Sequence, residues 1–216
     1  MFLQSFCYAN ESRPRLFFSS LDHVRVSETY LPLITQVYDE LGFDIEIVDM
    51  LDERASISIA NNLIDGAVLK GQAVIDRYPE MIKVEPQVTR AALYLFCQLE
   101  VRCDLAVLQD KKISIGITVG FNRNWGNEFN AQLATFGTFE DLKLVFIRKR
   151  LNYILYPDEV AKTQPWQENF NSINFKESGV YHVLAPKHKK LATKVSPILA
   201  AKLALLVGNL NPKSKS

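Results

Sequence analysis

The sequence predicts an α/β fold in which two doubly wound lobes are joined by strands. Strand-like and helix-like segments alternate as β-α-β-α-β from Pro14 to Leu69, which is the pattern of a parallel sheet covered by helices. A second alternation, β-α-α-β, starts after residue 100 and ends at Pro157. The composition is 48% hydrophobic and 23% charged over 216 residues, which is typical of a globular chain of about one or two domains.

The elements of the first alternation follow from the spacing of apolar residues. Apolar side chains repeat at helical spacing from Tyr30 to Gly42, and they alternate with acidic side chains from Phe43 to Val48. Thr29 is expected to cap the first helix, and Gly42 is expected to end it. We therefore expect a strand at 14–20, a helix at 30–42, a strand at 43–48, a helix capped by Asp52 at 53–62 and a strand at 63–69.

The second half of the chain contains a capping signature in which Thr138 is followed three residues later by Asp141. Pro197 is expected to break or restart the last helix, with Ser196 as its cap. The expected elements are strands at 91–101 and 113–119, helices at 124–134 and 138–150, strands at 152–157 and 179–186, and a helix at 191–207.

The charge distribution argues against a nucleic-acid-binding protein, because the formal net charge is only +1. The charge is uneven, however, since lysines but no acidic residues follow Glu177. We interpret these lysines as a solvated helix face and tail; the alternative is contact with an acidic partner or a membrane surface.

Motifs for catalysis, metals and cofactors are not found in the sequence. The three histidines, His23, His182 and His188, show neither the H-E-x-x-H spacing nor proximity to a cysteine. The G-x-S-x-G and phosphate-binding-loop motifs are missing, and the glycines near 116–126 do not follow the G-x-G-x-x-G order. We therefore predict no metal, no cofactor and no enzymatic activity.

The N-terminal stretch 1–14 matches the end of a signal-peptide apolar region followed by a small-residue cleavage site near Ala9. The alternative is that this stretch forms an N-terminal strand. Cys97 and Cys103 enclose five residues, a spacing that suits a short loop but not a zinc site. They are expected either to form a disulfide in an oxidising compartment or to remain as two buried thiols.

Candidate binding residues lie where predicted strands end, because ligands of open α/β sheets bind beyond the carboxyl ends of the strands. This rule selects Ser19 and Ser20, the segments 52–54 and 65–70, and the segment 119–125. In the last of these, the free N–H groups at the start of a helix can hold an anion.

Arg123 adds a cationic fork to that segment, and Trp125 adds a stacking face. The competing interpretation of Trp125 is a structural aromatic residue of the second lobe. For Arg54 it is a surface ion pair with a neighbouring acidic residue, and for Lys70 and Arg77 it is solvated loop charge.

Two long segments, 30–48 and 52–86, resemble the bacterial periplasmic solute-binding proteins of the amino-acid-binding type, bacterial extracellular solute-binding family 3. The matching motifs are Glu40-Leu41-Gly42 at a helix end, Arg54-Ala55, the turn from Asn62 to Gly66, and the stretch from Tyr78 to Pro86. Residues 112–120 and 138–155 are similar to the corresponding parts of the second lobe. Lys70 stands where related sequences often have arginine, and Asn152 stands where aspartate is usual.

The resemblance implies a type II periplasmic binding fold with two α/β lobes and two crossing hinge strands. It implies that 1–14 is the remnant of a signal peptide, that 15–98 and 185–216 form lobe 1, and that 99–184 form lobe 2. A small solute, amino-acid-like or an organic acid, is then expected to bind between the lobes when the hinge closes.

The implied function is solute capture in the periplasm by a monomer that delivers its ligand to the permease of an ABC-type importer. The alternative is a stand-alone periplasmic sensor or accessory protein that signals to a membrane partner, and a small lyase such as a dehydratase is a further alternative. The expected ligand-binding residues are Arg54 and Lys70 for an anionic group, Asp65 for positioning, Tyr30 as an apolar or stacking wall, and Asn122, Trp125 and Tyr153 from the second lobe.

Overall fold

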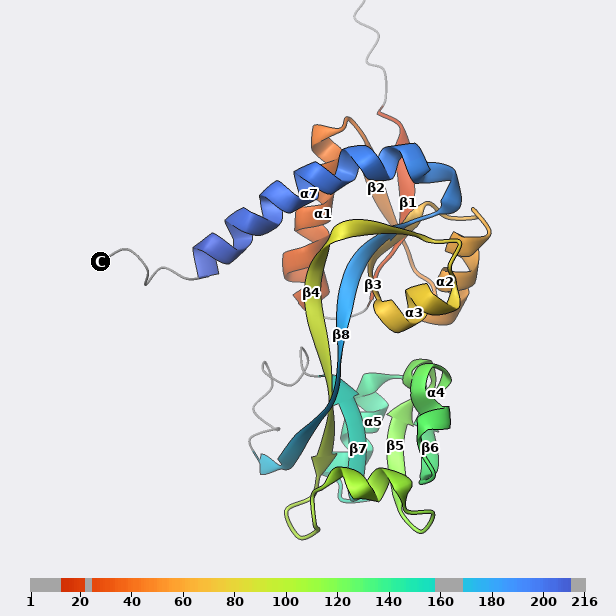
Figure 1. The fold of residues 1–216 in the computed structure, drawn as a ribbon, viewed down its shortest axis with the longest axis vertical. Helices are drawn as coiled ribbons and strands as arrows, with labels where there is room; N and C mark the ends of the chain where they lie inside the picture. Colours follow the sequence, from red (N-terminus) through yellow and green to blue (C-terminus); the bar gives the residue numbers. More distant parts are fainter. Residues whose placement is uncertain (1–12, 22–24, 158–168, 211–216) are drawn as a thin grey trace, which may run out of the picture.

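Two lobes and a pair of long strands that runs between them make up the computed structural model, which describes residues 13–21, 25–157 and 169–210. The long strands are β4 (Ile82–Cys97) and β8 (Asn171–Leu184), which pair antiparallel from one lobe to the other (Figure 1). The predicted architecture of two α/β lobes connected by two strands is therefore confirmed.

The first lobe is formed by both ends of the chain, because the C-terminal helix returns to pack on it (Figure 1). Its elements are β1 (Arg15–Ser19), η1 (Val26–Tyr30), α1 (Leu31–Glu40), β2 (Asp44–Val48), α2 (Asp52–Ala60), β3 (Gly66–Gly71), α3 (Gln72–Arg77), η5 (Pro186–His188) and α7 (Lys189–Leu210).

The second lobe is formed by the segment between β4 and β8 (Figure 1). Its elements are η2 (Leu105–Gln109), β5 (Ser114–Thr118), α4 (Val119–Trp125), η3 (Gly126–Glu128), β6 (Gln132–Phe136), α5 (Phe139–Ile147) and β7 (Tyr153–Pro157).

The strands form one hydrogen-bonded series in the order β2-β1-β3-β8-β4-β7-β5-β6. The series is continuous because β4 and β8 contribute to both lobes. Within each lobe the outer strands are parallel, as in the pairs β1–β2 and β5–β6, whereas β3 pairs antiparallel with β8 and β7 pairs antiparallel with β4. The ladder between β4 and β8 shifts register between Val84 and Thr89 and again between Leu93 and Tyr94.

Separate groups of buried side chains support the two lobes. In the first lobe, α1 and α7 cover one face of the sheet around Phe18 and Ile34, and α2 and α3 cover the other face around Ile59. In the second lobe, α5 packs Leu142 and Phe146 on one face, while η2 and the residues around Phe129 cover the other. Because both faces of each sheet are covered, the inner strands β3 and β7 are buried along almost their whole length.

Several predicted helix boundaries are correct, and the caps explain them. Thr138 begins α5, and its hydroxyl accepts a hydrogen bond from the Asp141 N–H at 3.1 Å, as the capping signature predicts. Gly42 ends the first helix with a positive φ of 78°, which glycine adopts without the strain that a side chain would cause. Asp52, by contrast, does not cap α2: Leu51 occupies the cap position and Asp52 is the first helical residue.

Two predictions from the sequence are wrong in the second half. The helix expected at 124–134 begins earlier, at Val119, and residues 132–136 form strand β6 because they pair in register with β5. Pro197 does not break the last helix, which continues from Lys189 to Leu210. Val195 and Leu199, on either side of this proline, are fully buried against the first lobe, and this packing holds the helix together through the proline.

A disulfide lies at the point where β4 ends in the second lobe. Cys97, at the end of β4, is bonded to Cys103, with an S–S distance of 2.04 Å, so the bridge ties the end of a long strand to the chain that leads into β5.

The region 1–14 expected to be a signal-peptide remnant falls almost entirely outside the described residues. Within the described residues, no helix combines the length and the apolarity needed to cross a membrane.

His182 is a buried polar residue on β8 in the core of the first lobe. Its Nδ1 lies 3.2 Å from the Val68 carbonyl oxygen, which can only accept, so Nδ1 carries the proton and Nε2 accepts from the Tyr38 hydroxyl at 2.8 Å. Burial lowers the pKa of His182 to about 4, despite hydrogen bonds to backbone carbonyls that act in the opposite direction. The fold therefore requires the neutral ring.

We predict that this histidine makes the folded state sensitive to acid. The histidine of the unfolded chain binds a proton below a pH of about 6.5, whereas His182 of the folded chain binds one only below about pH 4. The free energy of unfolding therefore falls as the pH is lowered through this range, by on the order of 3 kcal/mol. Urea unfolding of the wild type and of His182→Gln at several pH values measures the effect. Wild type should lose more free energy of unfolding between pH 7 and 4 than the variant; equal slopes for the two proteins would contradict the assignment.

Candidate functional site

The carboxyl ends of the strands in the two lobes face each other. β8 runs from the second lobe into the first, so β3, which is antiparallel to it, runs toward the second lobe together with its parallel neighbours β1 and β2. β4 runs the other way, so β7 and its parallel neighbour β5 run toward the first lobe (Figure 1). The loops and helix starts that follow these strands therefore lie between the lobes, where α/β sheets bind ligands.

Lys70 is a buried cation near the carboxyl end of β3. Only 3% of its surface is exposed, and its ammonium donates to the Oδ1 atom of Asp52 and, at 3.3 Å, to the Asp52 main-chain carbonyl. Asp52 is the first residue of α2, and its carboxylate remains 43% exposed. A buried ammonium is tolerated when it is paired in this way, so the interaction joins β3 to the start of α2.

Glu53, the next residue of α2, accepts hydrogen bonds from three side chains. The Tyr78 hydroxyl donates to its Oε1 at 2.7 Å, and Arg77 Nη1 lies 3.2 Å from its Oε2. Arg123 Nη1, from helix α4 of the second lobe, lies 3.0 Å from its Oε1. Glu53 therefore connects the two lobes directly.

These surroundings favour the ionised form of Glu53. Burial alone raises the pKa of Glu53, but the hydrogen bond from Tyr78 and the charges of Arg77 and Arg123 outweigh it, so this pKa lies below its ordinary value. Burial and the adjacent Glu53 carboxylate raise the pKa of Tyr78, which keeps its hydroxyl protonated as a donor. The cluster is therefore a carboxylate held by two guanidinium groups and a phenol.

Four of the residues predicted to bind ligand belong to elements at this junction. Lys70 is on β3, Arg54 is exposed on the first turn of α2, and Asn122 and Trp125 are on α4. Asn122 is partly exposed, and its amide lies directly against Gly126, where a side chain would displace it. The side chain of Trp125 lies outside the part of the chain that is described.

Tyr30 lies at a different place, in the core of the first lobe. It is 5% exposed and packs among the residues that connect η1 and α1 to the sheet. Such burial gives it a structural role in the lobe that forms one side of the junction.

Asp65 stands at the amino end of β3, away from the second lobe. Its carboxylate accepts from the Phe17 N–H at 2.8 Å, from His188 Nε2 at 2.7 Å and from Lys187 Nζ at 2.8 Å. Burial raises the pKa of Asp65, but these donors outweigh burial and hold that pKa below its ordinary value. The residue thereby joins β1 and the start of the C-terminal helix region to β3, and the structure does not bring it together with Lys70.

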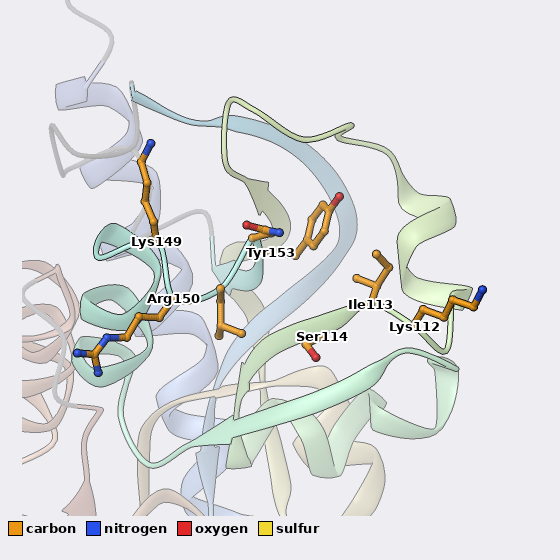
Figure 2. A pocket seen from close by; sticks show the side chains of 8 residues that line it. Lys112, Ile113, Ser114, Lys149, Arg150 and Tyr153 are labelled. Atoms are coloured by element: carbon orange, nitrogen blue, oxygen red, sulfur yellow. The ribbon is translucent and has the colours of Figure 1, made fainter.

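Tyr153 begins β7, at the end of the second lobe remote from the first. Its hydroxyl donates to the Arg102 carbonyl oxygen at 3.1 Å, and burial with the nearby Asp104 raises its pKa. It lines a surface pocket of about 400 Å³ that the sequence did not predict (Figure 2). The pocket is bordered by Lys112, Ile113, Ser114, Lys149, Arg150, Leu151, Asn152 and Tyr153.

The basic side chains of this pocket do not converge on one point. Figure 2 shows the side chains of Lys112 and Arg150 extending away from each other on opposite sides. Lys149 is also engaged, because its ammonium pairs with Glu100. The pocket therefore lacks the convergent donors that an anion-binding site requires.

Glu53 and Asp52 are the residues that reasoning from sequence did not nominate as central. The rule of strand ends selects both 52–54 and 119–125, but it does not say which side chains of the two segments meet. An acidic residue in the first turn of a helix is ordinarily explained by its favourable interaction with the helix dipole. The sequence therefore gives no reason to expect that Glu53 has a partner in the other lobe.

The fold is shared with solved structures of amino-acid-binding proteins. The substrate-binding protein of an amino acid ABC transporter has a TM-score of 0.72 at 14% identity, covering 90% of this chain and 98% of its own. The GluR0 ligand-binding core in complex with L-glutamate has a TM-score of 0.74 at 10% identity, covering 91% and 95%.

A third similar structure is the ancestral amino acid-binding protein AncCDT-1, a precursor of cyclohexadienyl dehydratase, with a TM-score of 0.70 at 12% identity, covering 90% and 94%. No protein-family model matches the sequence, and no curated protein matches it either. At these identities the likeness establishes the type II periplasmic binding fold, as the sequence predicts.

We predict an asymmetric effect of removing either partner of the Lys70–Asp52 pair. Asp52→Asn leaves a buried ammonium without its counter-charge and should lower the free energy of unfolding by about 1–3 kcal/mol. Lys70→Met leaves an exposed carboxylate and fills the same space, so its cost should stay below about 1.5 kcal/mol. Urea unfolding at pH 7 compares the two variants, with Glu46→Gln on the exposed pair with Arg15 as a control. A larger loss in Lys70→Met than in Asp52→Asn would contradict the description.

Proposed function

We propose that this protein binds a small polar or anionic solute between its two lobes, as the solute-capture component of an ABC-type importer. The observation that carries the proposal is the facing of strand ends from two lobes, with charged side chains gathered at the junction. The similar amino-acid-binding structures, one of them from an amino acid ABC transporter, support it. Periplasmic location, a monomeric state and a membrane permease as partner are parts of the same proposal.

The charges at the junction support a ligand with an anionic group. Lys70, Arg77 and Arg123 supply cations, Arg54 adds an exposed one, and the acidic residues facing them are Asp52 and Glu53. A ligand carboxylate at this junction replaces an acidic side chain as the partner of one of these cations. It then forms bidentate hydrogen bonds with a guanidinium group. Asn122 supplies an amide from the second lobe that donates to or accepts from the same solute.

A second candidate is a sensor or accessory protein that reports ligand or conformational state to a membrane partner. The pairing of Lys70 with Asp52, and of Arg123 with Glu53, favours it, because cations already engaged within the chain offer less to a solute. A lyase, such as a dehydratase, is the enzymatic alternative, in view of the descent of cyclohexadienyl dehydratase from AncCDT-1. A turnover assay on purified protein tests for the lyase.

The test of solute binding is a thermal-shift screen of amino acids, organic acids and small polar metabolites. A solute that binds the folded state at a hundred times its Kd stabilises it by about 2.7 kcal/mol, which raises the Tm by several degrees. A carboxylate-bearing compound is expected among the compounds that raise the Tm. If no compound raises the Tm, solute capture is refuted and the accessory role gains support.

We predict that the compound found in this way depends on Arg54 and Lys70. Removing both charges, by Arg54→Gln with Lys70→Met, should weaken its binding at least about tenfold, because hydrogen bonds to charged groups are lost. Isothermal titration calorimetry measures the change, and circular dichroism verifies that the variant is folded. Arg15→Gln, a surface change on the far side of β1, is the matched control. Unchanged affinity in the double variant would dismiss both assignments.

A further inference from the structure

We propose that Glu53 and Arg123 form a latch that holds the two lobes together when no solute is bound. The two residues belong to different lobes, α2 in the first and α4 in the second, and their charged groups are 3.0 Å apart. The two lobes can then come together without a bound solute. The proposal does not depend on which solute binds, or on whether any solute binds.

The acidic half of the latch is oriented by its own lobe. The Tyr78 hydroxyl and the Arg77 guanidinium hold the Glu53 carboxylate from the end of α3, leaving the Glu53 side chain 28% exposed. A side chain that is already held loses little rotamer freedom when a further partner arrives, and such freedom is the main cost of a surface ion pair. Arg123 therefore meets a preformed acceptor.

The basic half is connected to the second lobe through the helix that carries it. Arg123 is 50% exposed, so it projects from α4, whereas Phe121 two residues earlier packs its ring against Phe139 at 5.6 Å and against the buried side chains of the lobe. Because α4 packs into the second lobe in this way, the pairing of Arg123 with Glu53 connects the whole of that lobe to the first. A second cross-lobe contact lies nearby, where Ala73 of α3 packs against the same buried group.

The strands between the lobes permit relative movement. β4 and β8 lose their regular register between Leu93 and Tyr94, close to the second lobe, and such irregularities are places where a strand pair bends. Two lobes on a bendable strand pair adopt a distribution of separations. An ion pair formed only at short separation shifts that distribution toward the closed form.

The size of the shift follows from the exposure of the pair. Exposed ion pairs change an equilibrium by roughly 1.4- to fivefold. The three-donor arrangement around Glu53 places this pair near the upper end, so loss of the latch should lower the ratio of closed to open molecules about two- to fivefold.

The experiment measures the distance between the lobes in the absence of any solute. A spin label or dye is attached at Asn61→Cys on the first lobe and at Asn127→Cys on the second, both exposed positions, in a Cys7→Ser background. The distance distribution is recorded for the parent protein, for Glu53→Gln, for Arg123→Gln and for the double variant. Arg15→Gln, which breaks an exposed ion pair within the first lobe, is the control.

We expect each single variant to lower the ratio of closed to open molecules about two- to fivefold and the double variant to do no more than either, because both remove the same interaction. Raising the salt to 1 M should open the parent protein in the same way and leave the variants unchanged. The latch is refuted if the distributions of Glu53→Gln and Arg123→Gln match the parent, or if Arg15→Gln shifts the distribution equally. Because no solute is present, this outcome is independent of the thermal-shift screen.

Discussion

The pairing of β4 with β8 is the interaction on which the rest of the structure depends. These strands are hydrogen-bonded from the first lobe to the second, and each lobe builds its own parallel strands outward from them. Their antiparallel direction determines that β3 and β7 point toward each other, and thereby that the strand ends of both lobes face the same space. The junction between the lobes, with its charged residues, is therefore a geometric result of one strand pair.

Apart from the exposed Arg54, the charges at the junction are arranged in pairs. The burial of Lys70 depends on its pairing with Asp52, and Tyr78, Arg77 and Arg123 hold the pKa of Glu53 below its ordinary value. Solute recognition on this scaffold thus involves exchanging partners among groups that are already satisfied. This arrangement differs from a cavity lined with unpaired donors. A measurement of the distance between the two lobes therefore reports on the state of the site as much as a measurement of ligand affinity does.

Much of the fold was predictable from the sequence, because periodicity and caps are local. The alternation from Phe43 to Val48 and the cap at Thr138 each appear as expected. Strand β6 was missed because its pairing with β5 is a tertiary interaction that overrides a weak local preference. The continuous helix through Pro197 likewise depends on the burial of Val195 and Leu199, which no local rule contains.

The site was less predictable, because strand direction and exact boundaries decide where a residue lies. Asp65 immediately precedes β3 and Tyr153 begins β7, so both lie at the amino ends of their strands. Lys70, by contrast, lies near the carboxyl end of β3. A shift of a few residues in a boundary thus moves a side chain from one end of a lobe to the other. The contact between Glu53 and Arg123 joins residues far apart in the sequence and required the structure.

The order of the elements along the chain has a consequence for how the protein assembles. The sheet of the first lobe lacks a central strand until β8 is placed between β3 and β4, and its apolar core stays uncovered until α7 packs on it. The whole second lobe is synthesised in between. The lobe whose strands emerge first from the ribosome is therefore the last to be completed, and its exposed apolar face must avoid aggregation during that interval.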